Sequence, residues 1–236
     1  YSPAFKLLIS GGNGISVFHV GNTFKKIKIP INIPSDIVAI AVKEPEKAES
    51  CEIWIGTRYD GTLRLVFHKN LQCRIDHYTF SDGLAAGPVI PFNLEKEVVF
   101  GTIDGLSKFT NENIVKETLP DSLKNDPDFS RGYFSSFYIS KDSIGKSVSS
   151  LVDCPEKIWI CADNHLGYLN KSNYDFFIRA PFMGVDAGKI NCIYPEKNGI
   201  CWFGTTDGLI RYNMNSGKNY SAEFQSLIRK VHVIRG

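Results

Sequence analysis

The 236-residue sequence predicts an all-β fold, and three observations support this prediction. Short apolar segments recur along the chain, and turns with Asp-Gly or Asn-Gly separate many of them. No stretch longer than about one turn has a persistent helical periodicity. Most decisively, five segments share one arrangement of strand, turn and strand, which predicts five hairpins. They lie near 7–18, 53–66, 98–109, 158–169 and 200–212.

The spacing of these hairpins predicts how they assemble. The second residue of each turn serves as a marker, and these markers are Gly14, Gly61, Gly105, His165 and Gly208. They are 47, 44, 60 and 43 residues apart, and a period in the mid-forties is typical of a propeller blade. Further strands are expected before the hairpins, at 37–42, 89–92, 147–152 and 190–194. Others are expected after them, at 24–29, 74–79 and 114–119.

We therefore expect a β-propeller of four-stranded antiparallel blades over residues 1–220, with about five blade repeats. The first hairpin lacks an innermost strand, so these blades are expected to belong to a larger ring of the seven-blade type. The 60-residue interval predicts an insertion at 120–146, where long loops between repeats often carry recognition. Residues 221–236 are expected to form a junction toward a following domain.

Composition excludes several classes of function. The 27 basic and 25 acidic side chains are scattered, so a dedicated nucleic-acid module is not expected in this chain. No window of about 18 uncharged apolar residues predicts a membrane span. The six cysteines lack metal-ligand spacing and are most simply small buried residues, so no metal site is expected. A disulfide between Cys192 and Cys201 is possible if 189–194 and 199–204 form a hairpin in an oxidising compartment.

The segments Trp54-Ile55-Gly56-Thr57 and Trp202-Phe203-Gly204-Thr205 resemble the two-component regulator propeller repeat. Phe80-Ser81-Asp82-Gly83-Leu84 is similar to the connector that precedes a new blade in that family. The resemblance covers residues 7–213, and 224–233 resemble the junction with a tyrosine-rich immunoglobulin-like domain. The fourth repeat departs from the pattern, because Cys161 and Ala162 replace its Gly-Thr pair and His165 replaces its turn glycine.

This resemblance implies the extracytoplasmic, periplasmic sensor region of a membrane-anchored hybrid histidine kinase. Such a region would bind a small molecule such as an oligosaccharide, and would signal through the packing of a homodimer. The chain has no phosphoacceptor helix and no ATP-binding glycine box, so we expect neither catalysis nor a cofactor in it.

In a propeller, the turns between second and third strands open on the same face as the connectors between blades. A ligand is therefore expected at that rim, with two further residues contributed by the insertion. The candidate ligand-binding residues are Arg58, Tyr59, Asp60, Asp104, Asp163, Asn164, His165, Thr206 and Asp207, with Arg131 and Tyr133 from the insertion. No catalytic residue is assigned. The aspartates are also favoured by turn formation alone, and the strand residues Trp54, Trp159 and Trp202 are expected to pack between blades.

Two other functions are compatible with such a fold. One is a propeller enzyme acting on a polysaccharide, either a glycoside hydrolase or a lyase, which would need titratable groups converging near the axis. The other is a protein-interaction scaffold, which would present a large apolar patch.

Overall fold

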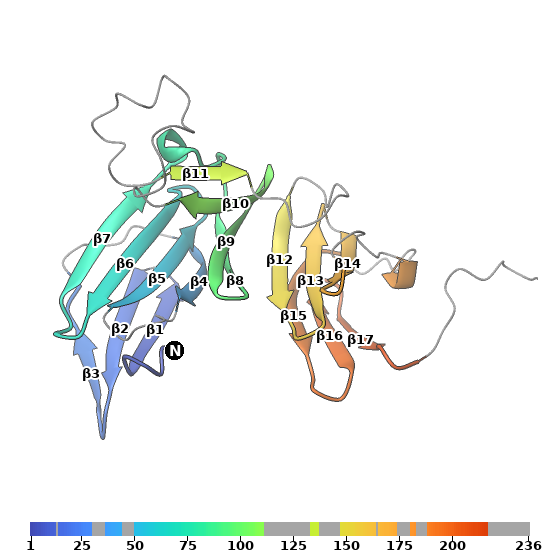
Figure 1. The fold of residues 1–236 in the computed structure, drawn as a ribbon, viewed down its shortest axis with the longest axis horizontal. Helices are drawn as coiled ribbons and strands as arrows, with labels where there is room; N and C mark the ends of the chain where they lie inside the picture. The colour runs from blue at the N-terminus through green and yellow to red at the C-terminus, as the bar shows by residue number, and fades with distance from the viewer. Residues whose placement is uncertain are drawn as a thin grey trace, which may run out of the picture.

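The fold is described by a computed structural model for residues 1–12, 14–29, 36–43, 50–110, 133–136, 147–163, 165–173, 180–182 and 188–216. All regular structure in these residues is β-strand, apart from two short 3-10 turns, η1 (Phe80–Asp82) and η4 (Ala180–Phe182). The predicted all-β class is therefore confirmed (Figure 1). None of the described segments forms a helix with the length and apolar character needed to cross a bilayer.

The strands form five antiparallel sheets, which follow one another in sequence order. The first sheet contains β1 (Leu7–Gly12), β2 (Gly14–Val20) and β3 (Phe24–Ile27). The second contains β4 (Ile37–Lys43), β5 (Ser50–Thr57), β6 (Thr62–His68) and β7 (Cys73–Tyr78). The third contains β8 (Ile90–Leu94), β9 (Glu97–Thr102), β10 (Gly105–Thr110) and β11 (Tyr133–Ser136).

The fourth sheet contains β12 (Val148–Asp153), β13 (Lys157–Ala162) and β14 (His165–Asn170). The fifth contains β15 (Ile190–Pro195), β16 (Ile200–Thr205) and β17 (Leu209–Asn213). Two sheets thus have the four strands expected of a blade, and the other three have three strands within the described residues.

The fourth strand of the third sheet differs from the expected one. The segment 114–119, predicted for that place, lies outside the described residues. The strand paired with β10 is β11, in which Tyr133 lies opposite Thr110. This strand falls within 120–146, the range predicted as an insertion, so that part of the chain contributes to the third sheet itself.

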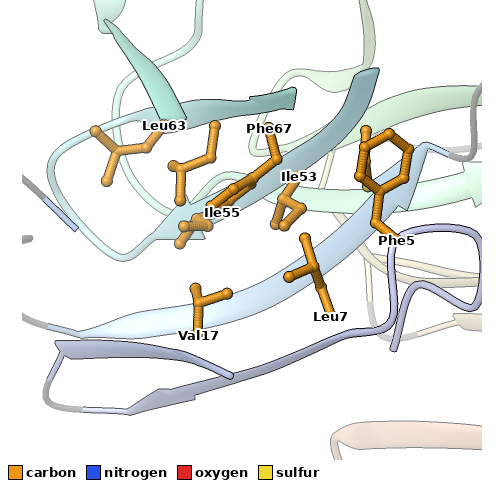
Figure 2. Packing of buried hydrophobic residues seen from close by; sticks show 9 residues of the cluster. Phe5, Leu7, Val17, Ile53, Ile55, Leu63 and Phe67 are labelled. Carbon is orange, nitrogen blue, oxygen red and sulfur yellow. The ribbon is translucent and has the colours of Figure 1, made fainter. Parts of the chain in front are cut away.

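Consecutive sheets pack through their leading strands. β1 contacts β4, β4 contacts β8, β8 contacts β12, and β12 contacts β15 (Figure 1). Figure 2 shows the apolar layer between the first two sheets, where Leu7 and Val17 point toward Ile53 and Ile55. Both faces of β5 are covered by neighbouring sheets, which explains why it has an almost continuous apolar run.

A glycine within a strand permits this close packing. A Cβ atom added at Gly56 would collide with the carbonyl oxygen of Val89, and one added at Gly101 would collide with that of Val148. In both cases the collision is with the backbone that enters the first strand of the next sheet. The repeated glycine therefore provides the space in which the next sheet approaches.

Aromatic side chains fill the remaining space between sheets, as the sequence predicts for Trp54 and Trp159. The ring centroid of Trp54, in the second sheet, lies 4.9 Å from that of Phe100 and 4.9 Å from that of Phe109, both in the third. Trp159 lies 5.4 Å from Phe203 in the fifth sheet. Trp202 is only half-buried, so the expectation of packing between sheets is not met at this third tryptophan within the described residues.

The disulfide considered between Cys192 and Cys201 is contradicted by the strand register. Cys192 lies opposite Gly204, whereas Cys201 lies opposite Pro195, three pairs further along the hairpin. Three pairs correspond to about 10 Å along a strand, beyond the roughly 7 Å between Cα atoms that a disulfide can bridge. Both thiols are free, with Cys201 buried and Cys192 exposed.

Candidate functional site

The predicted rim is built from turns that share one hydrogen-bonding device. In the second sheet, the Thr57 hydroxyl donates to the Gly61 carbonyl at 2.9 Å and accepts from the Asp60 backbone N–H at 2.8 Å. The third sheet repeats this with Thr102, and the fifth repeats it with Thr205. The recurrent threonine, aspartate and glycine therefore form the turn itself, as the turn interpretation of the aspartates predicts.

Other rim residues hold the connector that leads into their own sheet. The Asp163 carboxylate accepts from the Ser147 backbone N–H at 2.8 Å. The Thr206 hydroxyl accepts from the Lys189 backbone N–H at 3.0 Å. The Arg58 backbone N–H donates to the Asp36 carbonyl, and the two side chains approach to 3.7 Å. These three candidate residues therefore have structural roles at the ends of their strands.

The remaining candidates differ in their exposure. Tyr59 is 75% exposed, and Asp104, His165 and Asp207 are also exposed side chains at their turns. Asp60 is half-buried, and its carbonyl oxygen lies 2.6 Å from Nε2 of His77. Since a carbonyl can only accept, this ring nitrogen of His77 carries the proton.

For three predicted site residues, the structure describes no side chain. Asn164 and Arg131 lie outside the described residues, and Tyr133 is placed by its backbone in β11. Among the described side chains, no three His, Cys, Asp or Glu residues are grouped so as to hold a metal ion.

A cavity of about 840 Å³ lies at the opposite ends of the strands, between the fourth and fifth sheets. Its walls are the turn 153–157, which joins β12 to β13, and the turn 195–199, which joins β15 to β16. Trp159, Met214 and Asn215 complete the lining. Its volume lies within the range of small-molecule sites, and its position between two sheets is typical of such sites.

Several polar groups of the cavity already have partners. The Asp153 carboxylate forms an ion pair with Lys171 and accepts from the Glu95 backbone N–H at 2.6 Å. The Glu196 carboxylate accepts from Nε1 of Trp202 at 2.6 Å and from the Asn198 amide at 2.8 Å. These bonds fix the two turns that form the walls.

The other polar groups at the cavity differ in how far a ligand could reach them. The side chain of Trp159 is fully buried, and its Nε1–H has no hydrogen-bond partner among the described residues. A buried donor of this kind usually finds a partner. Glu156 and Lys197 are exposed at the two turns, on opposite sides of the cavity. Lys157 holds its ammonium 4.4 Å from the ring centre of Tyr168.

The charges around the cavity balance. Its lining carries the carboxylates of Asp153, Glu156 and Glu196 and the ammonium groups of Lys157 and Lys197, and Lys171 neutralises Asp153. An environment with equal numbers of opposite charges and several amides suits a neutral, hydroxyl-bearing molecule better than an ion.

The Cys154 thiol lines the same cavity but is poorly suited to nucleophilic chemistry. Burial raises its pKa, the neighbouring Asp153 carboxylate raises it further, and Lys171 lowers it only in part. A thiol with a raised pKa stays protonated near neutral pH, and the thiolate is the nucleophile. Cys154 is therefore a structural residue of the cavity wall.

The sequence does contain a signal for these turns. The tripeptide Pro-Glu-Lys occurs at 45–47, 155–157 and 195–197, each time between the first and second strands of a repeat. The prediction of the site from the Asp-Gly turns did not include this second recurring feature. A tripeptide that recurs at the same end of three of the five sheets indicates a related surface there.

The chain was compared with family models, with characterised proteins and with solved structures. No family model matches the chain, and no characterised protein matches it in sequence. Among solved structures, it is similar to the extracellular domain of BT4673 from B. thetaiotaomicron, a protein assigned as a one-component system. The TM-score is 0.54 at 17% identity, over 95% of this chain and 27% of that chain. This chain thus spans about a quarter of the length of that structure, and at this identity the similarity concerns the fold.

Proposed function

We propose that this chain is part of the extracytoplasmic ligand-sensing region of a signal-transduction protein of the two-component type, and that its five sheets are blades of a β-propeller. Two findings support the arrangement. Each sheet packs on the next through its leading strand, and a strand glycine receives the next sheet at Gly56 and again at Gly101. The similar solved structure is itself an extracellular domain of a one-component system.

The observation that carries the proposal is the cavity between the fourth and fifth sheets. It combines exposed charged side chains of both signs with the amides of Asn198 and Asn215 in its lining. Amides and charges of both signs can exchange hydrogen bonds with the hydroxyl groups of a sugar, so the proposed ligand is a neutral oligosaccharide. In this proposal the chain binds the ligand without converting it.

A ligand in this position would touch turns from two different sheets. Of the arrangements that the two sheets can adopt, the ligand would favour the one to which it binds more tightly. A ligand shifts an equilibrium only by its differential affinity for the two states. In the proposed mechanism, this change in sheet packing is passed to the packing of a dimer.

The proposal is tested by calorimetric titration and thermal shift with a panel of neutral oligosaccharides. The cavity variants are Glu156→Gln and Lys197→Gln, two exposed side chains without a described role in the fold. The matched rim variants are Asp104→Asn and His165→Gln, which change the same number of polar side chains at the opposite ends of the strands.

We expect saturable binding that raises the melting temperature, without a change in the sugar over prolonged incubation. The cavity pair should weaken binding at least about tenfold, a loss of roughly 1.4 kcal/mol, and the rim pair should leave it unchanged. Binding lost only in the rim pair would move the site to the predicted turns and reject the cavity. Absence of binding across the panel, or release of a cleaved sugar, would reject the proposed function.

A further inference from the structure

Two cysteines face each other across the interface between the fourth and fifth sheets. Cys201 on β16 is fully buried and belongs to the apolar cluster that fills this interface, together with Trp159 of the fourth sheet. Cys154 directly follows β12 and packs against the same cluster, as Val152 does two residues earlier. The Cys154 backbone N–H donates to the Lys157 carbonyl at 2.9 Å, which continues the strand pairing. Since alternate residues of a strand share a face, the Cys154 side chain points toward the fifth sheet.

The two thiols also lie at the same end of this interface. Cys154 lines the cavity, and Cys201 lies opposite Pro195, which lines the cavity from the other sheet. The charge of a Cys154 thiolate raises the pKa of Cys201, and such an effect requires the two sulfur atoms to be near each other. Both thiols are free in the structure.

The leading strands of the two sheets come close together at this place. Cα atoms of β12 and β15 lie within 8 Å of one another, whereas stacked sheets are usually about 10 Å apart. A disulfide joins residues whose Cα atoms are at most about 7 Å apart. Cys154 and Cys201 adjoin these two strands, so a bond between them needs only a small approach of the sheets.

The other cysteines of these two sheets are less well placed. Cys161 comes two residues after Trp159, whereas Cys201 comes one residue before the equivalent Trp202. The two cysteines are therefore about 10 Å apart along the strands. Cys192 is exposed and lies opposite a residue three positions from Cys201, so its side chain is on the other face of the fifth sheet.

The two remaining cysteines belong to the second sheet. Cys51 and Cys73 lie opposite Phe67, on either side of it. A whole strand thus separates them by about 10 Å, which is beyond the reach of a disulfide.

We propose that Cys154 and Cys201 form a disulfide that cross-links the fourth and fifth sheets at the wall of the cavity. Each thiol loses one proton and one electron when the Sγ–Sγ bond forms. The oxidant is a small disulfide such as oxidised glutathione, whose own sulfur–sulfur bond breaks and which leaves as two thiols. Disulfides persist in extracytoplasmic compartments, so the bond agrees with the proposed location, although its test does not depend on that location.

The environment of the thiols determines when the bond forms. Burial raises the pKa of Cys154, and it raises that of Cys201 to about 12, so the folded chain carries few thiolates near neutral pH. The thiolate is the species that attacks a disulfide. The bond therefore forms while the chain folds, when both thiols are still in contact with water.

The first test is oxidative refolding of the reduced chain from urea, in a mixture of oxidised and reduced glutathione. Free thiols are then blocked with iodoacetamide, and the chain is digested and analysed by mass spectrometry without reduction. We expect one disulfide, between the peptides that contain Cys154 and Cys201, and no bond between any of the other cysteines. A chain without a disulfide, or with a bond between another pair, would overturn the proposal.

Two single variants are matched, because each removes one cysteine from these sheets. Cys154→Ser removes a member of the pair, whereas Cys192→Ser removes an exposed thiol outside it and with it the most accessible site for glutathione. We expect no disulfide in Cys154→Ser and an unchanged Cys154–Cys201 bond in Cys192→Ser. A bond from Cys201 to a different cysteine in Cys154→Ser would show that the pairing does not depend on this interface, and would contradict the proposal.

The melting temperature is a readout that chance pairing would not raise. A disulfide compatible with the native fold stabilises it by restricting the unfolded chain, so the oxidised chain should melt roughly 5–15 °C higher than the same chain after reduction. Cys154→Ser should melt at one temperature with and without reductant. An oxidised chain that melts no higher than the reduced one would mean that the bond strains the two sheets, and would reject it as part of the native structure.

Discussion

The threonine before each tight turn satisfies two backbone groups with one hydroxyl. At Thr102 the hydroxyl donates to the Gly105 carbonyl and accepts from the Asp104 N–H, and the side chain is 3% exposed. Thr205 makes the same two bonds but is only half-buried. A hydroxyl that is both donor and acceptor explains why threonine recurs there instead of valine.

Replacing this hydroxyl should therefore cost most where water cannot take its place. We expect Thr102→Val to lower the free energy of unfolding by about 1–3 kcal/mol, because two buried backbone groups lose their partner. Thr205→Val should cost less than about 1 kcal/mol, since solvent reaches the same groups. Urea denaturation of both variants measures the difference. Equal losses would contradict a role for burial.

The half-buried thiol of Cys73 and the buried thiol of Cys201 lower the free energy of unfolding at alkaline pH. Burial raises the pKa of Cys73 to about 11, and burial with the charge of Cys154 raises that of Cys201 to about 12, against 9.0 for a free thiol. Between these values the unfolded chain loses protons that the native chain keeps. Their contribution is complete below pH 9 and is lost as the pH rises toward 11 and 12.

We therefore expect the urea midpoint to fall from pH 8 to pH 10. Cys201→Ala should have a lower midpoint at pH 8, because it leaves a small cavity, but a shallower fall with pH, because one buried thiol is gone. The comparison is between the two slopes, since tyrosines and lysines ionise in both proteins. Identical slopes would show that this thiol does not couple folding to pH.

At the scale of the strands, the recurrent strand glycine is tightly packed in the second sheet, at Gly56, and loosely packed in the fifth, at Gly204. We expect Gly56→Ala to destabilise the chain by about 1–3 kcal/mol or more, because the new methyl group would meet the Val89 carbonyl and Pro91. Gly204→Ala should cost less than about 1 kcal/mol, since among the described residues only the exposed Cys192 side chain must move. Thermal and urea unfolding provide the measurement, and equal losses at the two positions would contradict this difference.

The hairpins were the most predictable part of this fold. Their signal is local: an apolar strand, a turn glycine that needs positive φ, and a second strand within a few residues, as at Gly61 and Gly105. The strand β11 lacks such a signal, because it joins β10 across residues 111–132 of intervening sequence. A pairing over that distance depends on tertiary packing, which local patterns do not encode.

Register and site were harder to predict for a related reason. The expected Cys192–Cys201 pair assumed a hairpin of 189–194 with 199–204, whereas the observed strands pair Pro195 with Cys201 next to the turn, and this register places Cys192 opposite Gly204. At the rim, the candidates came from residue types that bind ligands well. The same types also bind backbone, and Asp163 and Thr206 do so here.

At the scale of the whole molecule, the sheets form a nearly one-dimensional stack. The second, third and fourth sheets have extensive contacts with the sheets directly before and after them, so stability arises from single sheets and from the interfaces between them. Within the described residues, the first and fifth sheets are covered on one face only. The central strands show this difference: β5 and β13 are almost wholly buried, whereas β16 alternates between buried and half-buried residues.

Hydrogen exchange should follow this order. We expect backbone amides of β5 and β13 to exchange most slowly and those of β16 to exchange faster in dilute protein, although all three are central strands of their sheets. The reason is that, among the described residues, the fifth sheet is packed on one face only. Mass-spectrometric exchange measures all of these rates, and a β16 as protected as β13 would contradict this order.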